Sequence, residues 1–186
     1  MADLKSPNFL KYYDDEKYLI GVSQTFRDSG LISPEDFLTI LAWKANRATT
    51  YHLKRLQTNA GSFSEAVKGI TIDIRRAEDH KARLEILMSA KWGFYLATAT
   101  AILTILYPED FTVYDYRVAG LLNFAQELRQ RDFSDSLWQK YMEFRERVRS
   151  YPPPELNLSL RDCDRYMSGE SYRKDIEIAC KEYSAS

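Results

Sequence analysis

The residues best suited to chemistry lie in one stretch, from position 91 to position 118. A turn at Gly93 opens a helix with alanines at 97, 99 and 101, and the chain then returns to a carboxylate, Asp115, at the head of the next helix. Small side chains allow another backbone to approach that helix closely. Backbone N–H groups at a turn and at a helix N-terminus are available to bind an anion. The spacing therefore predicts that Asp115 and the Gly93 turn lie on the same side of the molecule.

Several other chemistries lack the residues that they need. The seven glycines are isolated, so there is no phosphate-binding loop, and no G-x-S-x-G nucleophile motif occurs. The two histidines, His52 and His80, lie far apart, and neither has a second ligand four residues on. Two cysteines, Cys163 and Cys180, are too few for a four-cysteine zinc or iron–sulfur site. The sequence predicts no metal, no iron–sulfur cluster and no other cofactor.

Four features of the 91–118 stretch match a known superfamily. Gly93 takes the place of the second glycine of a hairpin, Ala97 follows in the next helix, A-I-L stands at 101–103, and Asp115 lies within V-Y-D-Y-R-V at 113–118. In these features the chain resembles the helix-hairpin-helix superfamily of base-excision DNA glycosylases. The resemblance implies their helical fold and makes Asp115 the catalytic acid group.

Two positions depart from the superfamily pattern. Lys91 stands in place of the first hairpin glycine, where its side chain could contact a phosphate instead of the turn backbone. Tyr95 falls where bifunctional members carry a nucleophilic lysine, and tyrosine occurs there in some monofunctional relatives that excise adenine. The resemblance therefore implies a monofunctional N-glycosyl hydrolase, unless Lys91 or Lys44 supplies the Schiff-base amine.

The resemblance also assigns roles to residues around Asp115. Breaking a base–sugar bond develops positive charge on the sugar, which a fixed carboxylate stabilises. The base is first flipped into a pocket with aromatic walls, for which the candidates are Trp43, Tyr95, Tyr114 and Tyr116. The candidates for holding the nucleic acid and its phosphates are Lys44, Arg47, Lys91, Trp92, Gly93 and Arg117. The implied partner is DNA.

A second resemblance spans most of the chain. W-K-A-N-R at 43–47, the stretch from A-I-L to D-Y-R at 101–117 and R-D-C-D-R at 161–165 are similar, in this order, to segments of a set of uncharacterised bacterial proteins. That resemblance implies no activity. The charges of 161–165 suit an ion-pair network that closes the fold, or else Asp162 or Asp164 lies in the cleft and shares its chemistry. Arg117 has an acid such as Asp164 as a candidate partner.

Asp115 also suits a purely structural role. An aspartate at a helix N-cap contributes about 1 kcal/mol of stability without any catalysis. On that interpretation the chain is a non-catalytic helical module that binds nucleic acid or a protein partner. A third alternative, a small-molecule enzyme on the same scaffold, has only the carboxylates in its favour.

The composition bounds these alternatives. Of the 186 residues 45% are hydrophobic, enough for a core, and 26 basic against 27 acidic residues exclude a uniformly basic nucleic-acid coat. Positive charge is still concentrated at 44–91, as expected if one face met an anion. The most apolar stretch, 92–107, is shorter than the ~20 residues that span a bilayer, and residues 1–6 do not resemble a signal peptide. We expect a cytoplasmic protein without a membrane partner.

Helical periodicity runs through nearly the whole chain. Ser33, followed by Pro34 and two acids, predicts a helix that continues to Leu53 or Leu56. Further helices are predicted after 62–64 and at 78–88, 94–106, 116–128, 137–148 and 158–166, with a loop or helix continuation at 70–74 and a frayed helix or tail from 172. The pattern predicts an all-α fold of about eight helices around the apolar helix at 94–106.

The chain is short enough to be a single α-helical domain, residues 1–186. A division into two lobes would fall at about 30–90 and at 91–186 together with the N-terminal segment. The stiff run of prolines at 151–154 marks a break within the second part.

Overall fold

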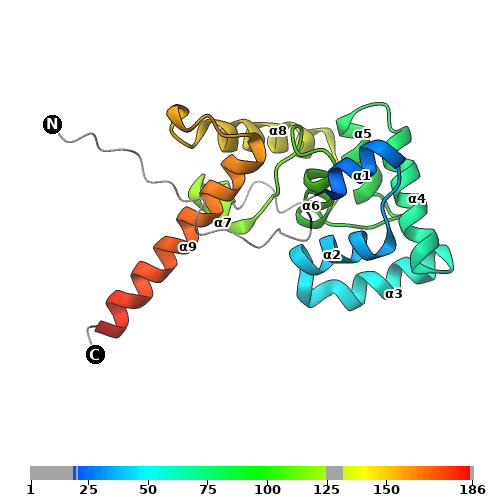
Figure 1. Cartoon of the computed structure of the whole chain (residues 1–186), viewed down its shortest axis with the longest axis horizontal. Coiled ribbons are helices and arrows are strands. Elements are labelled where there is room, and N and C mark those ends of the chain that lie inside the picture. The colour runs from blue at the N-terminus through cyan, green and yellow to red at the C-terminus, as the bar shows by residue number, and fades with distance from the viewer. Residues whose placement is uncertain (1–18, 20, 125–131, 185–186) are drawn as a thin grey trace.

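The computed structural model describes residues 19, 21–124 and 132–184 of the chain (Figure 1). All regular structure in these ranges is helical, which confirms the predicted all-α class. The described residues form nine α-helices, close to the eight expected, and two short 3₁₀ helices at Asn46–Ala48 and Pro154–Leu156. The α-helices are α1 (Val22–Ser29), α2 (Pro34–Ala45), α3 (Thr49–Ala60), α4 (Phe63–Arg76), α5 (His80–Met88), α6 (Leu96–Leu106), α7 (Tyr116–Leu121), α8 (Asp135–Ser150) and α9 (Leu160–Ser184).

Helix α6 lies at the centre of the fold, as the sequence predicts. Ten of its eleven residues are buried, including three threonines. Helices α1, α2 and α5 all pack against it, and the ribbon in Figure 1 shows it surrounded by them. A helix that is apolar on every side is stable in water only when other elements cover it on every side.

The predicted helix start at Ser33 is confirmed, and of the two candidates for the next helix, Ser62 and Ser64, the structure has Ser62 as the N-cap. The Ser33 hydroxyl accepts a hydrogen bond from the Asp36 N–H (3.0 Å), and the Ser62 hydroxyl accepts one from the Glu65 N–H (3.1 Å). Residues 70–74 continue α4 as a helix, which was one of the two outcomes expected. Helix α1 lies in a segment for which the sequence pattern predicted no element.

The prediction of one helix from Ser33 to Leu53 or Leu56 is wrong. The backbone of Ala45 leaves the helical region (φ −131°, ψ 42°), a 3₁₀ turn follows, and α3 begins in a new direction. This turn allows α3 to pack against α4. No glycine or proline marks the break in the sequence, because tertiary packing and not local propensity produces it.

The helix predicted at 116–128 is also too long. Helix α7 ends at Leu121, and Asn123 adopts a left-handed conformation (φ 58°). The Phe124 N–H then donates to the Ala119 carbonyl (2.8 Å), and the Phe124 side chain is buried. This is the usual way in which a left-handed residue closes a helix. Residues 125–128 of the prediction lie outside the described residues.

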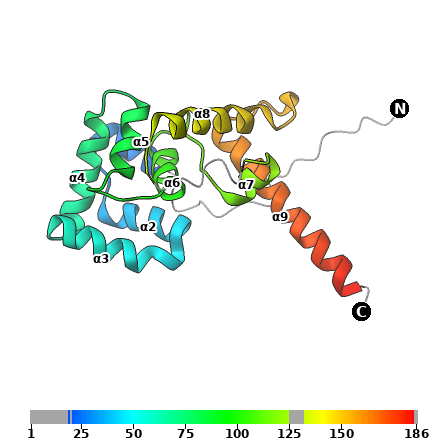
Figure 2. The ribbon, with the colours of Figure 1, turned by 180° about the vertical axis from the view of Figure 1, so that it is seen from behind.

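The two C-terminal helices follow the predicted pattern. Leu137, Tyr141, Phe144 and Val148 of α8 are all buried, and the chain breaks after Ser150 as the prolines predict. Helix α9 is longer than expected, because it continues without interruption through the region predicted as a frayed helix or tail. Its C-terminal half points away from the other helices in both views (Figures 1 and 2).

The buried apolar side chains form one hydrophobic core that extends from Leu19 to Met167. The proposed division into two lobes stays a prediction. None of the described helices is long and apolar enough to cross a membrane.

Candidate functional site

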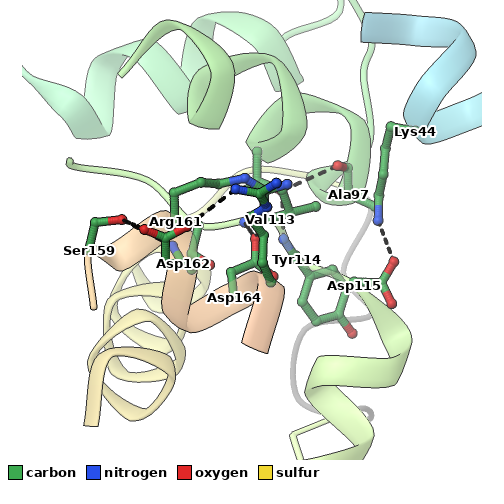
Figure 3. Close-up of polar contacts among 12 residues, drawn as sticks. Lys44, Ala97, Val113, Tyr114, Asp115, Ser159, Arg161, Asp162 and Asp164 are labelled. Carbon is green, nitrogen blue, oxygen red and sulfur yellow. Dashed lines mark hydrogen bonds and ion pairs between the residues drawn. The ribbon is translucent and has the colours of Figure 1, made fainter. Parts of the chain in front are cut away.

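Asp115 and Lys44 meet at the junction of two helices. Asp115 is the N-cap of α7, and its Oδ1 accepts a hydrogen bond from the Arg117 N–H (2.8 Å). Its Oδ2 accepts one from the Nζ of Lys44 (2.7 Å), which reaches down from the last turn of α2 (Figure 3). The Lys44 side chain is 12% exposed and that of Asp115 is 26% exposed. The predicted cap is confirmed, and the structure adds an ion pair across 71 positions of sequence.

The extended segment that carries Asp115 is fixed between α6 and α8. The Thr112 N–H donates to the Tyr141 hydroxyl (3.1 Å), and that hydroxyl donates to the Thr112 carbonyl (2.8 Å). Burial raises the pKa of Tyr141, so its hydroxyl keeps the proton that it donates. The Tyr114 N–H donates to the hydroxyl of Thr100 on α6 (3.0 Å). These bonds hold Asp115 at a defined distance from the central helix.

A second carboxylate, Asp164 of α9, lies beneath this segment. It is 1% exposed, accepts a hydrogen bond from the Val113 N–H (3.3 Å) and forms an ion pair with Arg161 (Figure 3). The Arg161 guanidinium also lies over the Trp43 ring, 5.3 Å from its centre. Burial raises the pKa of Asp164, against the opposing effects of Arg161 and the Val113 N–H. Asp164 is thus a buried carboxyl group whose ion pair with Arg161 has a structural role.

The other charges near α9 pair among themselves. Asp162 accepts hydrogen bonds from the Ser159 hydroxyl (2.8 Å) and from Arg165 (3.3 Å), so it belongs to the start of its own helix. Arg117 forms an ion pair with an acid, as expected, but the acid is Asp175 and not Asp164, the example that the sequence suggested. Helix α7 packs against α9, and Asp175 lies about three helical turns beyond Asp164 on that helix. Within 161–165, Arg161 pairs with Asp164 and Arg165 pairs with Asp162. This segment is an ion-pair network, as the first interpretation of its sequence predicted.

The turn before α6 uses its own backbone donors. The Trp92 and Gly93 N–H groups both donate to the Ser89 carbonyl (3.2 and 2.6 Å). Gly93 has the positive φ (59°) that a turn at this position requires. The Arg55 guanidinium donates to the carbonyls of Trp92 and Gly93. These two N–H groups, which the sequence offered as phosphate donors, are therefore directed into the turn.

Lys91 and Trp92 share one partner that sequence reasoning missed. Asp73 of α4 accepts hydrogen bonds from the Lys91 Nζ (2.6 Å) and from the Trp92 indole N–H (2.9 Å). Trp92 is 3% exposed, whereas the Lys91 side chain is 61% exposed. Neither Asp73 nor Arg55 stands in a motif, and both are far from the turn in sequence, so no signal in the sequence identified them. The Gly93 turn is thus held by side chains of α3 and α4, whereas Asp115 is held by groups of α2 and α7.

The four aromatic residues predicted as pocket walls fall into two pairs. Tyr95 and Tyr116 are exposed, by 51% and 69%. Tyr114 is half-buried and meets the Phe144 ring edge-on, with 5.6 Å between ring centres. Trp43 is half-buried beneath Arg161. The structure therefore leaves two of the four accessible to a base, and it also leaves the predicted phosphate contact Arg47 exposed.

The two histidines have separate environments. Burial lowers the pKa of His52 to about 4, and the positive charge of Arg55 lowers it in the same direction. His80 lies 3.5 Å from a carboxylate oxygen of Asp110. Within residues 19, 21–124 and 132–184 no cluster of three or more His, Cys, Asp or Glu residues could hold a metal ion.

Comparison with known protein families, with curated proteins and with solved structures finds no match for this chain. The geometry around Asp115 and the charges of the described surface are therefore the observations that bear on its function.

Proposed function

We propose that this protein binds DNA and hydrolyses base–sugar bonds as a monofunctional glycosylase, with Asp115 as its acidic group. The observation that carries the proposal is the contrast between two neighbouring carboxylates. Asp164 is sealed in the core, whereas Asp115 remains 26% exposed and is held in one orientation by the Arg117 N–H. A fixed carboxylate at the edge of the core can stabilise positive charge that develops on a sugar.

The surrounding side chains support the same proposal. Tyr116 directly follows Asp115, and its exposed ring offers a surface on which an extruded base could stack. The exposed Arg47 supplies positive charge for a phosphate next to that nucleotide, whereas Lys44 is paired with Asp115 and would hold the carboxylate in place. In the reaction, Asp115 would stabilise the sugar cation and orient the attacking water. The helix-hairpin-helix resemblance has the same aspartate in the same role.

The test is fluorescence anisotropy with two DNA duplexes, one undamaged and one carrying a stable abasic-site analogue, at two salt concentrations. An abasic analogue mimics the product of any glycosylase, so the excised base need not be known. We expect tighter binding to the abasic duplex, weakened by salt and altered in Asp115→Asn. Asp79→Asn is a matched control, because Asp79 caps α5 through the Ala82 N–H (2.7 Å). Absence of binding to either duplex would refute the proposal.

One observation favours a second candidate, a non-catalytic helical module. Both oxygens of Asp115 already have partners, the Arg117 N–H and the Lys44 ammonium, so the residue is satisfied as a structural group. Equal, salt-sensitive binding of both duplexes would indicate a nucleic-acid module without this chemistry. Binding to neither would favour a protein partner, for which the exposed Tyr172, Ile178 and Tyr183 of α9 are candidates.

A further inference from the structure

A groove of about 300 Å³ lies between the loop joining α1 to α2 and the last turn of α4. It lies at the opposite end of α2 from Lys44, and α2 has 12 residues, which span roughly 18 Å. The groove is therefore separate from the Asp115 site. Its lining combines cationic and apolar side chains on two backbone segments: Gly30, Leu31, Ile72, Arg75 and Arg76.

Gly30 shapes one wall of this groove. It ends α1 in a left-handed conformation (φ 71°), and its N–H donates to the Phe26 carbonyl (2.8 Å). A Cβ at this position would overlap the Nη1 of Arg75, so the guanidinium occupies the space that any other residue would fill. The glycine thus leaves room for the guanidinium of Arg75, an exposed residue, to lie against the loop.

The two arginines of the groove carry charge that is not neutralised. Among the described residues neither Arg75 nor Arg76 makes a hydrogen bond or an ion pair, in contrast to Arg161 and Arg117. The dipole of α4 favours cations at its C-terminal end. The helix dipole explains why arginines stand at this end of α4. It does not explain why Leu31, an apolar side chain that is 41% exposed, lies beside them. The groove has both the charge and the apolar surface of a binding site.

We propose that this groove binds a small organic anion that carries a phosphate or carboxylate group on an apolar body. Arginine forks bind such oxyanions through paired N–H donors, and Arg75 and Arg76 offer two forks from adjacent positions of one wall. Leu31 and Ile72 would cover the apolar body. The volume lies at the lower end of the range for small-molecule sites, which fits a ligand of the size of a substituted benzene ring.

The experiment is isothermal titration calorimetry of the full chain with phenyl phosphate, benzoate and inorganic phosphate, each in a separate titration. We expect phenyl phosphate to bind more tightly than inorganic phosphate, because only the former also contacts Leu31 and Ile72. Comparison of phenyl phosphate with benzoate shows which oxyanion the arginines prefer. Arg75→Gln and Arg76→Gln should each weaken binding by about tenfold to a hundredfold, since each removes charge-assisted hydrogen bonds.

Two further variants separate the contributions. Leu31→Gln should lower the affinity for phenyl phosphate and leave that for inorganic phosphate unchanged. Arg149→Gln removes an exposed arginine of α8, which lies outside the groove and outside the Asp115 site, and it should change neither affinity. Circular dichroism of each variant shows whether it is folded. If Arg75→Gln does not fold, Arg76→Gln and Leu31→Gln still test the proposal.

Three results would overturn the proposal. The first is equal affinity for phenyl phosphate and inorganic phosphate, which would show that the apolar lining makes no contact. The second is wild-type affinity in both arginine variants. The third is displacement of phenyl phosphate by duplex DNA, which would make the groove part of a nucleic-acid surface instead of a small-molecule site.

Discussion

Asp115 has two structural roles, and two substitutions separate them. Its Oδ1 caps α7 through the Arg117 N–H, and its Oδ2 pairs with Lys44, whose side chain is only 12% exposed. An asparagine in its place would cap as well as the aspartate does but would lose the ion pair, whereas an alanine would lose both. We expect Asp115→Asn to lower the free energy of unfolding by about 1–2 kcal/mol, between the values for surface and buried pairs. Asp115→Ala should lower it by about 1 kcal/mol more, the contribution of an N-cap.

Urea denaturation of the two variants measures this difference. With an m-value of about 2 kcal/mol per molar urea, the alanine variant should unfold at a midpoint about 0.5 M below that of the asparagine variant. Equal midpoints would refute the capping argument, and a wild-type midpoint in Asp115→Asn would refute a stabilising Lys44 pair. Because the asparagine variant keeps the cap of α7, a change in its binding to the abasic duplex could not be attributed to disruption of that helix.

Three further predictions concern residues around the site. Asp164→Ala leaves the largely buried Arg161 without its carboxylate, and we expect urea unfolding to show a loss of about 3 kcal/mol; a loss below about 1 kcal/mol would contradict the ion pair. The pKa of His52 is about 4 when folded, below its ordinary value of 6.5, so the unfolded chain binds the extra proton between these values. Stability should therefore fall by about 1–2 kcal/mol from pH 7 to pH 5, and His52→Phe should reduce that slope; an unchanged slope would show that other groups cause it. Gly93→Ala forces a side chain into a left-handed backbone and within 2.9 Å of the Arg55 guanidinium, so its thermal midpoint should drop by several degrees, about 2–4 °C per kcal/mol; an unchanged midpoint would contradict the strain.

The local elements were largely predictable because their signals are local. Serines at 33 and 62 accept the hydrogen bonds that start α2 and α4, and the four apolar residues of α8 all face the core. The errors fall where packing overrides propensity. Nothing local in the sequence stops α2 at Ala45, and the left-handed Asn123 that closes α7 is one conformation among several that asparagine adopts.

The candidate site shows the same division. The sequence by itself determined that Asp115 stands at a helix start, because a cap depends on residues two or three positions away. Only the tertiary structure decided that Lys44 would meet Asp115, 71 positions away, and that Asp164 would be buried where the Val113 N–H, 51 positions away, donates to it. It also directed the Gly93 turn to Arg55 and Asp73, contacts that no motif records. Ion pairs between distant elements depend on how the helices pack, and that packing is set by the whole core around α6.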